Sequence, residues 1–362
     1  MKYEKNENPF TLQFSYIPPQ YIQRSRLMED IISDLTRKIP THRCHFITGV
    51  RGSGKTVMMM EISRKVGELE DWITVNIDNP EGNILDELAR NLYRIPELNS
   101  LFINAKIDFS KLGIGLTIEK AKLIASNEQD ALRMMLDLLK KKKKKILVTI
   151  DEITYSEDVA SFSHALSSFA GLDYDIFVIM TGLKENIKEI KNKKSLTFLY
   201  RARDNELVPL NITSIIMEYM EVFEVDREQI EEMAWQTKGY SFAFQVLGYL
   251  YWENLSEVQS FEKIKKERIL LEYDKYLSEY VYEKIWEEMS AKDKKIVKTM
   301  ADFGLEKVDE IREKLKLSSN EFTVYRTRLI DKGIVKGQEY GVLKFKLPRF
   351  DEFVKNYTKY EN

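Results

Sequence analysis

The chain has 362 residues, too many for one ordinary domain and enough for two or three. Its 56 Lys and Arg residues against 58 Asp and Glu residues give a formal net charge of -2, which excludes a uniformly basic nucleic-acid-binding surface. A single cysteine excludes an internal disulfide and a cysteine-based zinc site, and three scattered histidines argue against a zinc hydrolase or a Ser-His-Asp hydrolase.

The polarity of the chain argues against a membrane or secreted protein. Residues 1–10 are polar and lack the apolar core of a signal peptide. The longest apolar stretch, residues 242–252, contains Gln245 and is too short to span a bilayer. We therefore expect a reduced, cytoplasmic protein without a membrane partner.

The first 210 residues alternate apolar, β-branched runs with helical patterns. The expected strands are residues 44–48, 72–77, 146–150, 176–180 and 206–210, and the expected helices follow residue 55 and cover 83–94, 127–139 and 157–170. Two glycines within residues 107–118 predict a hairpin there. This alternation predicts an α/β domain with a mostly parallel sheet covered by helices on both faces.

The β signal disappears after residue 212. Helical patterns cover 213–223, 227–237, 241–253 and 272–289, and then 291–301, 307–315 and 319–331, before a glycine-punctuated β pair at 333–345. Three helices followed by a β ribbon is the order of a winged helix-turn-helix. We therefore expect three domains, at residues 1–212, 213–289 and 290–362.

Residues 49–56, GVRGSGKT, match the phosphate-loop pattern G-x-x-x-x-G-K-[ST] between a predicted strand and a predicted helix. Glycines let the backbone N–H groups of such a loop close around phosphates, and the helix N-terminus attracts the same anion. We expect Lys55 to reach the β- and γ-phosphates and Thr56 to coordinate Mg²⁺. The expected nucleotide contacts are Gly49, Val50, Arg51, Gly52, Ser53, Gly54, Lys55, Thr56 and Val57.

The strand at 146–150 leads directly into Asp151 and Glu152. Asp151 is expected to hold Mg²⁺ and Glu152 to polarise a water for attack on the γ-phosphate. Thr181 either helps to position that water or is simply a polar strand end. Arg201 and Arg203, before the fifth predicted strand, either contact the γ-phosphate of their own or a neighbouring subunit or form an exposed pair.

These motifs occur in the order seen in AAA+ and STAND-type ATPases, and the chain resembles origin-recognition-initiator-like members of that group. The resemblance implies a P-loop ATPase domain, an α-helical lid and a winged helix. It also implies that Tyr21, Ile22 and Arg24 lie near the nucleotide and that residues 237–249 form the lid motif, where Ser241 replaces the usual proline. No guanine-specifying N-K-x-D follows the fourth strand, so ATP is the expected nucleotide.

The last 72 residues carry 17 Lys and Arg against 12 Asp and Glu, an excess of five positive charges. In a winged helix the third helix enters the major groove of duplex DNA. The residues expected to contact DNA are Asn320, Thr323, Arg326, Arg328, Lys336 and Lys344. The alternative is that this domain packs only on the ATPase core or on a protein partner.

The sequence thus predicts Mg²⁺-dependent ATP binding and hydrolysis that drive a conformational change or assembly on DNA. Self-association is expected because an arginine from a neighbouring subunit could complete the site. The alternative function is an ATP-gated DNA- or protein-binding switch with little turnover.

Overall fold

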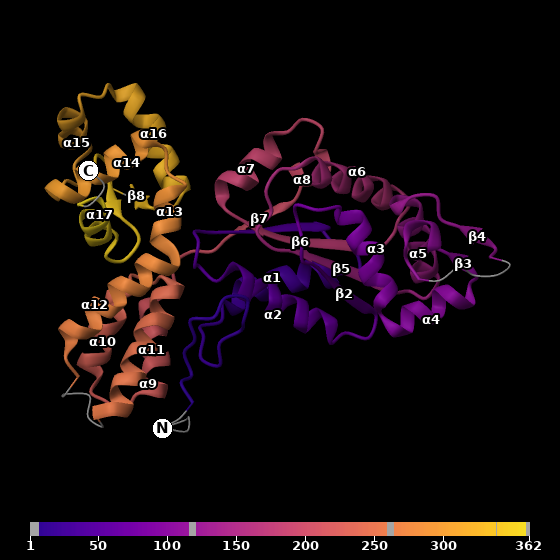
Figure 1. Ribbon diagram of the computed structural model, residues 1–362, viewed down its shortest axis with the longest axis horizontal. Coiled ribbons are helices and arrows are strands. Elements are labelled where there is room, and N and C mark those ends of the chain that lie inside the picture. Colours follow the sequence, from indigo (N-terminus) through magenta and orange to yellow (C-terminus); the bar gives the residue numbers. More distant parts are fainter. Residues whose placement is uncertain (1–6, 116–120, 259–263, 338, 360–362) are drawn as a thin grey trace. The chain divides into compact units, whose positions relative to one another are not determined.

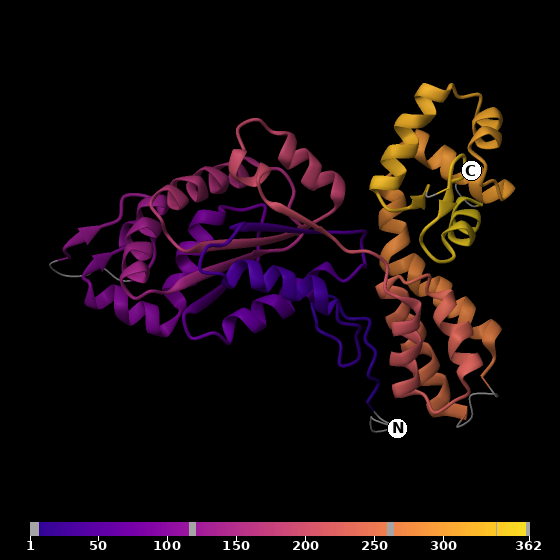
Figure 2. The ribbon, with the colours of Figure 1, turned by 180° about the vertical axis from the view of Figure 1, so that it is seen from behind.

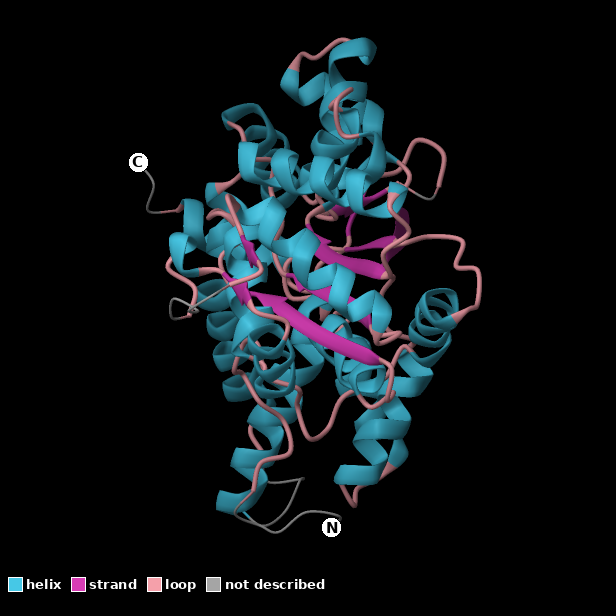
Figure 3. Ribbon diagram, turned by 90° about the vertical axis from the view of Figure 1, so that its right-hand side faces the viewer, coloured by secondary structure: helices cyan, strands magenta, loops and turns pink. Residues whose placement is uncertain are grey.

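The structure is a computed structural model, shown in Figure 1. It describes residues 7–115, 121–258, 264–337 and 339–359. Helices predominate over strands in these ranges (Figure 3). The chain folds into two compact units, each assembled from separate segments of the sequence. The predicted boundaries of three consecutive domains remain a prediction.

One unit contains residues 24–48 and 55–206 and is built around a five-stranded sheet (Figure 1). Its strands are β1 (Cys44–Thr48), β2 (Trp72–Ile77), β5 (Lys145–Ile150), β6 (Ile176–Gly182) and β7 (Arg203–Glu206). The order is β2-β5-β6-β1-β7 and all neighbours are parallel. Strands β1 and β6 are buried along their whole length, because helices cover both faces of the sheet. The predicted parallel α/β fold is confirmed.

The helices of this unit are α1 (Ser25–Thr36), α2 (Lys55–Gly67), α3 (Ile84–Arg94), α4 (Pro96–Asn104), α5 (Glu128–Lys141), α6 (Glu157–Gly171), α7 (Lys184–Asn192) and α8 (Thr197–Tyr200). Helices α1 and α2 lie on one face of the sheet, and α3, α6 and α7 on the other (Figure 2). The side chains of Asn83, Asn127 and Ser156 cap α3, α5 and α6, which is why these helices begin where they do.

Two predicted β elements are wrong. The fifth strand is Arg203–Glu206, whereas residues 207–210 form no strand; Pro209 has no N–H to give to a ladder. No hairpin forms within residues 107–115: β3 (Ile107–Asp108) runs into the 3-10 turn η1 (Ser110–Leu112) and pairs in parallel with β4 (Leu123–Ile124). The rest of that predicted hairpin, residues 116–118, lies outside the described residues.

The other unit combines the described residues up to 23, residues 49–54 and residues from 207 onward. Its first helices are α9 (Ile212–Val222), α10 (Arg227–Gln236), α11 (Ser241–Val258), α12 (Lys266–Leu277), the π-helical turn η3 (Ser278–Tyr282) and α13 (Glu283–Glu287). The N-terminal segment packs into this helical core through Phe10. The centroids of the Phe10 and Phe244 rings lie 5.5 Å apart, and those of the Phe244 and Tyr219 rings lie 4.8 Å apart. Gln245 fastens the same segment by accepting from the Thr11 N–H and donating to the Gln20 carbonyl.

The C-terminal elements follow in the predicted order. They are α14 (Ala291–Phe303), α15 (Val308–Leu315), α16 (Ser319–Asp331), the antiparallel pair β8 (Val335–Lys336) and β9 (Lys344–Phe345), and α17 (Phe350–Thr358). Ser318 and Glu321 form a capping box at the start of α16. Helix α17, which the sequence analysis did not predict, packs against α14. Across the described ranges, the protein has no helix with both the length and the apolar character needed to cross a membrane.

Candidate functional site

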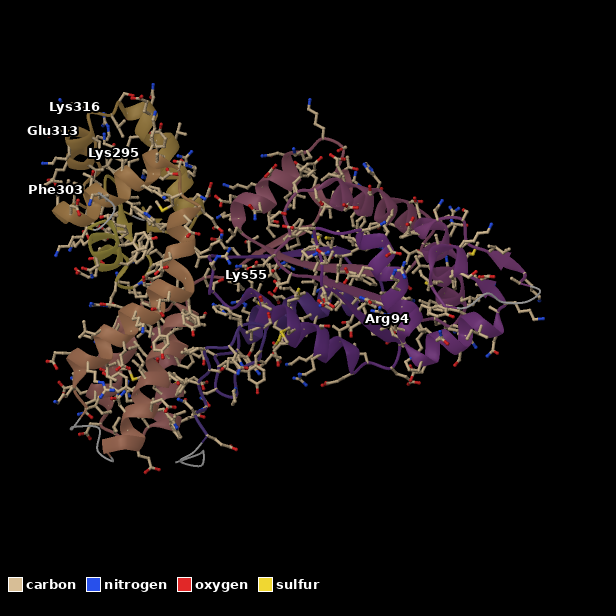
Figure 4. All side chains as sticks on the ribbon, viewed as in Figure 1. Lys55, Arg94, Lys295, Phe303, Glu313 and Lys316 are labelled. Atoms are coloured by element: carbon tan, nitrogen blue, oxygen red, sulfur yellow. The ribbon has the colours of Figure 1, made fainter. Side chains whose placement is uncertain are left out.

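The phosphate loop connects β1 to α2. Gly52 and Gly54 have φ values of +74° and +90°, in the left-handed region that favours glycine. The Ser53 N–H donates to the Val50 carbonyl over 3.2 Å and closes a tight turn. Lys55 begins α2 and is 7% exposed (Figure 4). The motif therefore has glycine at two positions whose backbone angles only glycine adopts without strain.

Three of the predicted site residues meet at the carboxyl ends of β5 and β6. The Thr56 hydroxyl donates to Asp151 Oδ2 over 2.7 Å, and the Thr181 hydroxyl donates to Asp151 Oδ1. The parallel register that pairs Ile150 with Met180 brings Asp151 beside Thr181. We refer to Thr56, Asp151, Glu152 and Thr181 as the acidic cluster.

Glu152 has a φ of +51°, which is uncommon for a residue with a side chain. Its N–H donates to the Thr181 hydroxyl over 3.1 Å and also contacts Asp151 Oδ1 at 3.1 Å. The next N–H, of Ile153, donates to the Thr181 carbonyl over 2.8 Å. Thr181 thus holds both the carboxylate of Asp151 and the main chain that directs the exposed side chain of Glu152.

The acidic cluster fits a magnesium ion bound together with phosphates. Thr56 and Asp151 supply a hydroxyl and a carboxylate, which are the hard oxygen ligands that Mg²⁺ prefers. Within the part of the chain that the structure describes, no group of three or more His, Cys, Asp or Glu side chains could hold a metal ion.

Arg201 and Arg203 lie just before and at the start of β7. Arg201 is the exposed C-cap of α8, and Arg203 begins β7, opposite His45 at the amino end of β1. Thr181 is level with Ile47 of β1 and Asn205 of β7, so Arg203 lies two residues before that level, about 7 Å along the strand at the usual rise. Arg203 thus lies toward the amino end of β7, whereas the acidic cluster lies at the carboxyl ends of β5 and β6.

The predicted adenine-side residues lie in the N-terminal segment. Ile22 is half-buried against the helical core, and Tyr21 accepts a hydrogen bond from Gln23. Arg24 is the N-cap of α1, and its carbonyl accepts from the Met28 N–H over 3.0 Å. Burial lowers the pKa of Arg24 to about 10, so its side chain stays cationic at neutral pH.

Two side chains of the phosphate loop contact the C-terminal half of the chain. Arg51 pairs with Glu288, just after α13, at 3.2 Å. The Val50 side chain lies directly over Gly333, where a Cβ atom would overlap it. Neither contact could be predicted from the motif, because the motif allows any residue at positions 50 and 51.

The sequence analysis missed the residues that hold the loop's carbonyl groups. The Tyr240 hydroxyl donates to the Arg51 carbonyl and the Ser241 hydroxyl to the Ser53 carbonyl, over 2.6 and 2.9 Å. The N–H of Phe242 donates to the carbonyl of Gly52 over 3.1 Å. The only available signal was their position in the predicted lid motif, which says nothing about the atoms they bind.

The predicted DNA contacts divide into engaged and exposed residues. Arg328 binds the fully buried Asp293 at 2.7 Å, and Arg326 donates to the Gly337 carbonyl over 3.3 Å. Lys344 lies within 4 Å of two glutamates. The remaining predicted contacts are exposed: Asn320, Thr323 and Lys336. Lys295 and Lys316 add exposed cations to the same region (Figure 4).

Comparison with known proteins bears on the fold. Residues 279–354 match a family model described as "Domain of unknown function (DUF8462)", and no curated protein matches the chain. The Walker-type ATPase PABY2304 of Pyrococcus abyssi is 17% identical with a TM-score of 0.64, covering 92% of this chain and 95% of that one. The Aeropyrum pernix ORC2 protein in its ADPNP–ADP complexes is 13% identical with a TM-score of 0.62, covering 96% and 97%. The chain has the fold of an origin-recognition-like AAA+ ATPase.

The AAA+ fold explains how the acidic cluster forms. Strand β6 lies between β1, which leads into the phosphate loop, and β5, which leads into Asp151. The carboxyl ends of parallel strands meet at one edge of a sheet, and ligands bind outside that edge. Thr181, near the end of β6, is therefore the residue best placed to bond to Asp151.

Proposed function

We propose that the protein binds ATP with Mg²⁺ and hydrolyses it, using the cycle to change conformation or assemble. The chain of hydrogen bonds from Thr56 through Asp151 and Thr181 to the main chain of Glu152 is the observation that supports this proposal. Thr56 and Asp151 would hold Mg²⁺, which neutralises charge on the β- and γ-phosphates when bound. Lys55 would bind the same phosphates.

Glu152 is the proposed base. Its carboxylate would orient a water molecule and take its proton as the new bond forms between the water oxygen and the γ-phosphorus. The bond from that phosphorus to the β–γ bridging oxygen breaks, and ADP and phosphate leave. Thr181 acts as a positioning residue, because its hydroxyl bonds to Asp151 and to the N–H of Glu152.

Arg201 and Arg203 lie just before and at the start of β7, whereas the acidic cluster lies at the carboxyl ends of β5 and β6, and this supports a need for a partner. A cationic side chain on the γ-phosphate accelerates such reactions by about 10³ to 10⁵. We propose that a second copy of the chain supplies it, which makes hydrolysis depend on self-association. The excess of positive charge in the last 72 residues supports duplex DNA as the assembling partner.

A second candidate is an ATP-gated switch with little turnover. It is favoured by the contacts of Arg51 and Val50 with Glu288 and Gly333, which connect the phosphate loop to the C-terminal half of the chain. In that case nucleotide state would alter the affinity for DNA or for a protein, because a ligand shifts only those states that it binds differently.

Calorimetry with ATP and Mg²⁺, followed by steady-state turnover, tests the proposal. Lys55→Ala should abolish nucleotide binding, whereas Glu152→Gln should bind ATP and fail to hydrolyse it. Lys65→Ala, also on α2, is the matched control and should behave as wild type. Absence of ATP binding by the wild type, or unchanged turnover by Glu152→Gln, would refute the respective assignment.

Turnover measured across protein concentration, with and without duplex DNA, separates the two candidates. Turnover that rises steeply with concentration and with DNA supports an assembled ATPase. Slow turnover that responds to neither, with a DNA or protein affinity that changes on ATP binding, supports the switch.

A further inference from the structure

Three successive residues, Tyr240 to Phe242, bond to three successive carbonyl groups of the phosphate loop. The hydroxyl of Tyr240 donates to Arg51, the N–H of Phe242 to Gly52, and the hydroxyl of Ser241 to Ser53. All three bonds lie within one unit of the structure. We refer to residues 240–242 as the carbonyl clamp.

We infer that the carbonyl clamp positions the phosphate loop for nucleotide binding. A trans peptide is planar, so its C=O and N–H groups point in opposite directions. Holding the carbonyls of Arg51 and Ser53 against the clamp turns the N–H groups of Gly52 and Gly54 away from it. Outward-directed N–H groups of this kind form the anion-binding concavity of a phosphate loop. The inference rests on the proposed function, since it concerns the same site.

The clamp lies in direct contact with the loop backbone. A Cβ atom on Gly52 would overlap the Tyr240 hydroxyl and would lie 3.1 Å from the Cβ atom of Phe242. Glycine is therefore required at position 52 both for its φ of +74° and for this close approach.

The clamp is itself held in place by its own neighbours. Gly239, with a φ of +75°, accepts from the Leu210 N–H over 2.7 Å and donates to the Thr237 hydroxyl over 3.1 Å. Tyr240 is 6% exposed and burial raises its pKa, so the phenol keeps its proton and stays a donor. A rigid donor array fixes the loop before nucleotide arrives, which reduces the ordering cost of binding.

The clamp acts on ground state and transition state alike. The N–H groups that it orients would contact phosphates that ATP and ADP share, so loss of the clamp removes binding that is common to substrate and product. We therefore expect a raised KM for ATP and weaker binding of both ATP and ADP, with kcat nearly unchanged. This split distinguishes the clamp from Thr181, which supports the catalytic groups.

The test compares Tyr240→Phe, Ser241→Ala and their double variant by calorimetry with ATP and with ADP. Each single change should weaken both nucleotides about tenfold and the double change more. Ser241→Thr keeps the hydroxyl and should restore affinity. Tyr219→Phe is the matched control, because it removes a buried hydroxyl–carbonyl bond of 2.7 Å, to Phe244, in the same unit.

Hydrogen exchange of a peptide covering residues 49–54, without nucleotide, reports on the loop independently of binding. Exchange should be several-fold faster in the double variant than in wild type or Tyr219→Phe. The inference is overturned if the double variant has unchanged exchange or unchanged affinity. It is also overturned if Tyr219→Phe loses as much affinity as the clamp variants. A wild type that binds no ATP overturns the proposed function instead, and the exchange result still decides whether the clamp holds the loop.

Discussion

Replacing Arg328 by Ala should destabilise the C-terminal region. Arg328 contacts both carboxylate oxygens of Asp293, each at 2.7 Å, and donates to the Ser290 hydroxyl over 2.9 Å. The Asp293 side chain is fully buried, whereas that of Arg328 is 38% exposed. The substitution therefore removes the cation and leaves an unpaired carboxylate in the core.

The expected loss of unfolding free energy depends on how exposed the side chains of Asp293 and Arg328 are. Removing one partner of a buried ion pair costs about 3–5 kcal/mol of unfolding free energy. Solvent at the guanidinium reduces this, since exposed pairs contribute only about 0–1 kcal/mol. Asp293 also keeps the Ser290 hydroxyl and lies in the first turn of α14, where a negative charge is favourable. We expect a loss of about 2 kcal/mol.

Urea unfolding, followed by a probe in the C-terminal region, measures this loss. The control is Lys295→Ala, on the same helix as Asp293. It removes an exposed cation and should change the unfolding free energy by less than about 0.5 kcal/mol. If Arg328→Ala also changed the unfolding free energy by less than about 0.5 kcal/mol, the ion pair would contribute little and the reasoning would be refuted. Because of this role, weaker DNA binding by an Arg328 variant does not by itself identify a DNA contact; the exposed Asn320 is the better probe.

Two further predictions concern the sheet. Thr181→Val should lower kcat about tenfold or more, because the carboxylate of Asp151 and the N–H of Glu152 lose a common partner; Thr149→Val, on the neighbouring strand, should keep wild-type turnover. Burial lowers the pKa of His45 from 6.5 to about 4. Between these pH values His45 is protonated in the unfolded chain but not in the folded one. The free energy of unfolding should therefore fall by about 3 kcal/mol as the pH decreases from 6.5 to 4. An NMR titration in which His45 protonates near pH 6.5 would contradict the second prediction.

Local patterns were sufficient for much of the fold. The apolar, β-branched runs at 44–48, 146–150 and 176–180 each became a strand, because a strand buried on both faces needs a continuous apolar run. The phosphate loop could be recognised because its eight residues are contiguous and the spacing of its glycines, lysine and threonine is the one that phosphate binding requires. Asp151 could be proposed as a metal ligand because it follows a buried strand.

Elements with weak local signals were predicted less well. The apolar pattern at 206–210 suggested a strand, yet the sheet adds the polar residues 203–206, because pairing with β1 decides which backbone is used. The glycines of 107–118 suggested a hairpin, yet β3 pairs in parallel with β4. In both cases tertiary pairing overrode local propensity.

The sequence by itself determined the class of fold, the phosphate loop and the carboxylates beside it, because each depends on residues close together in the chain. Only the tertiary structure decided that Arg203 pairs with the amino end of β1, that Arg328 pairs with Asp293, and that Tyr240 bonds to a loop residue 189 positions earlier. Those outcomes depend on which distant segments pack together, and a hydroxyl or guanidinium acquires its role only from the carbonyl or carboxylate that packing sets against it.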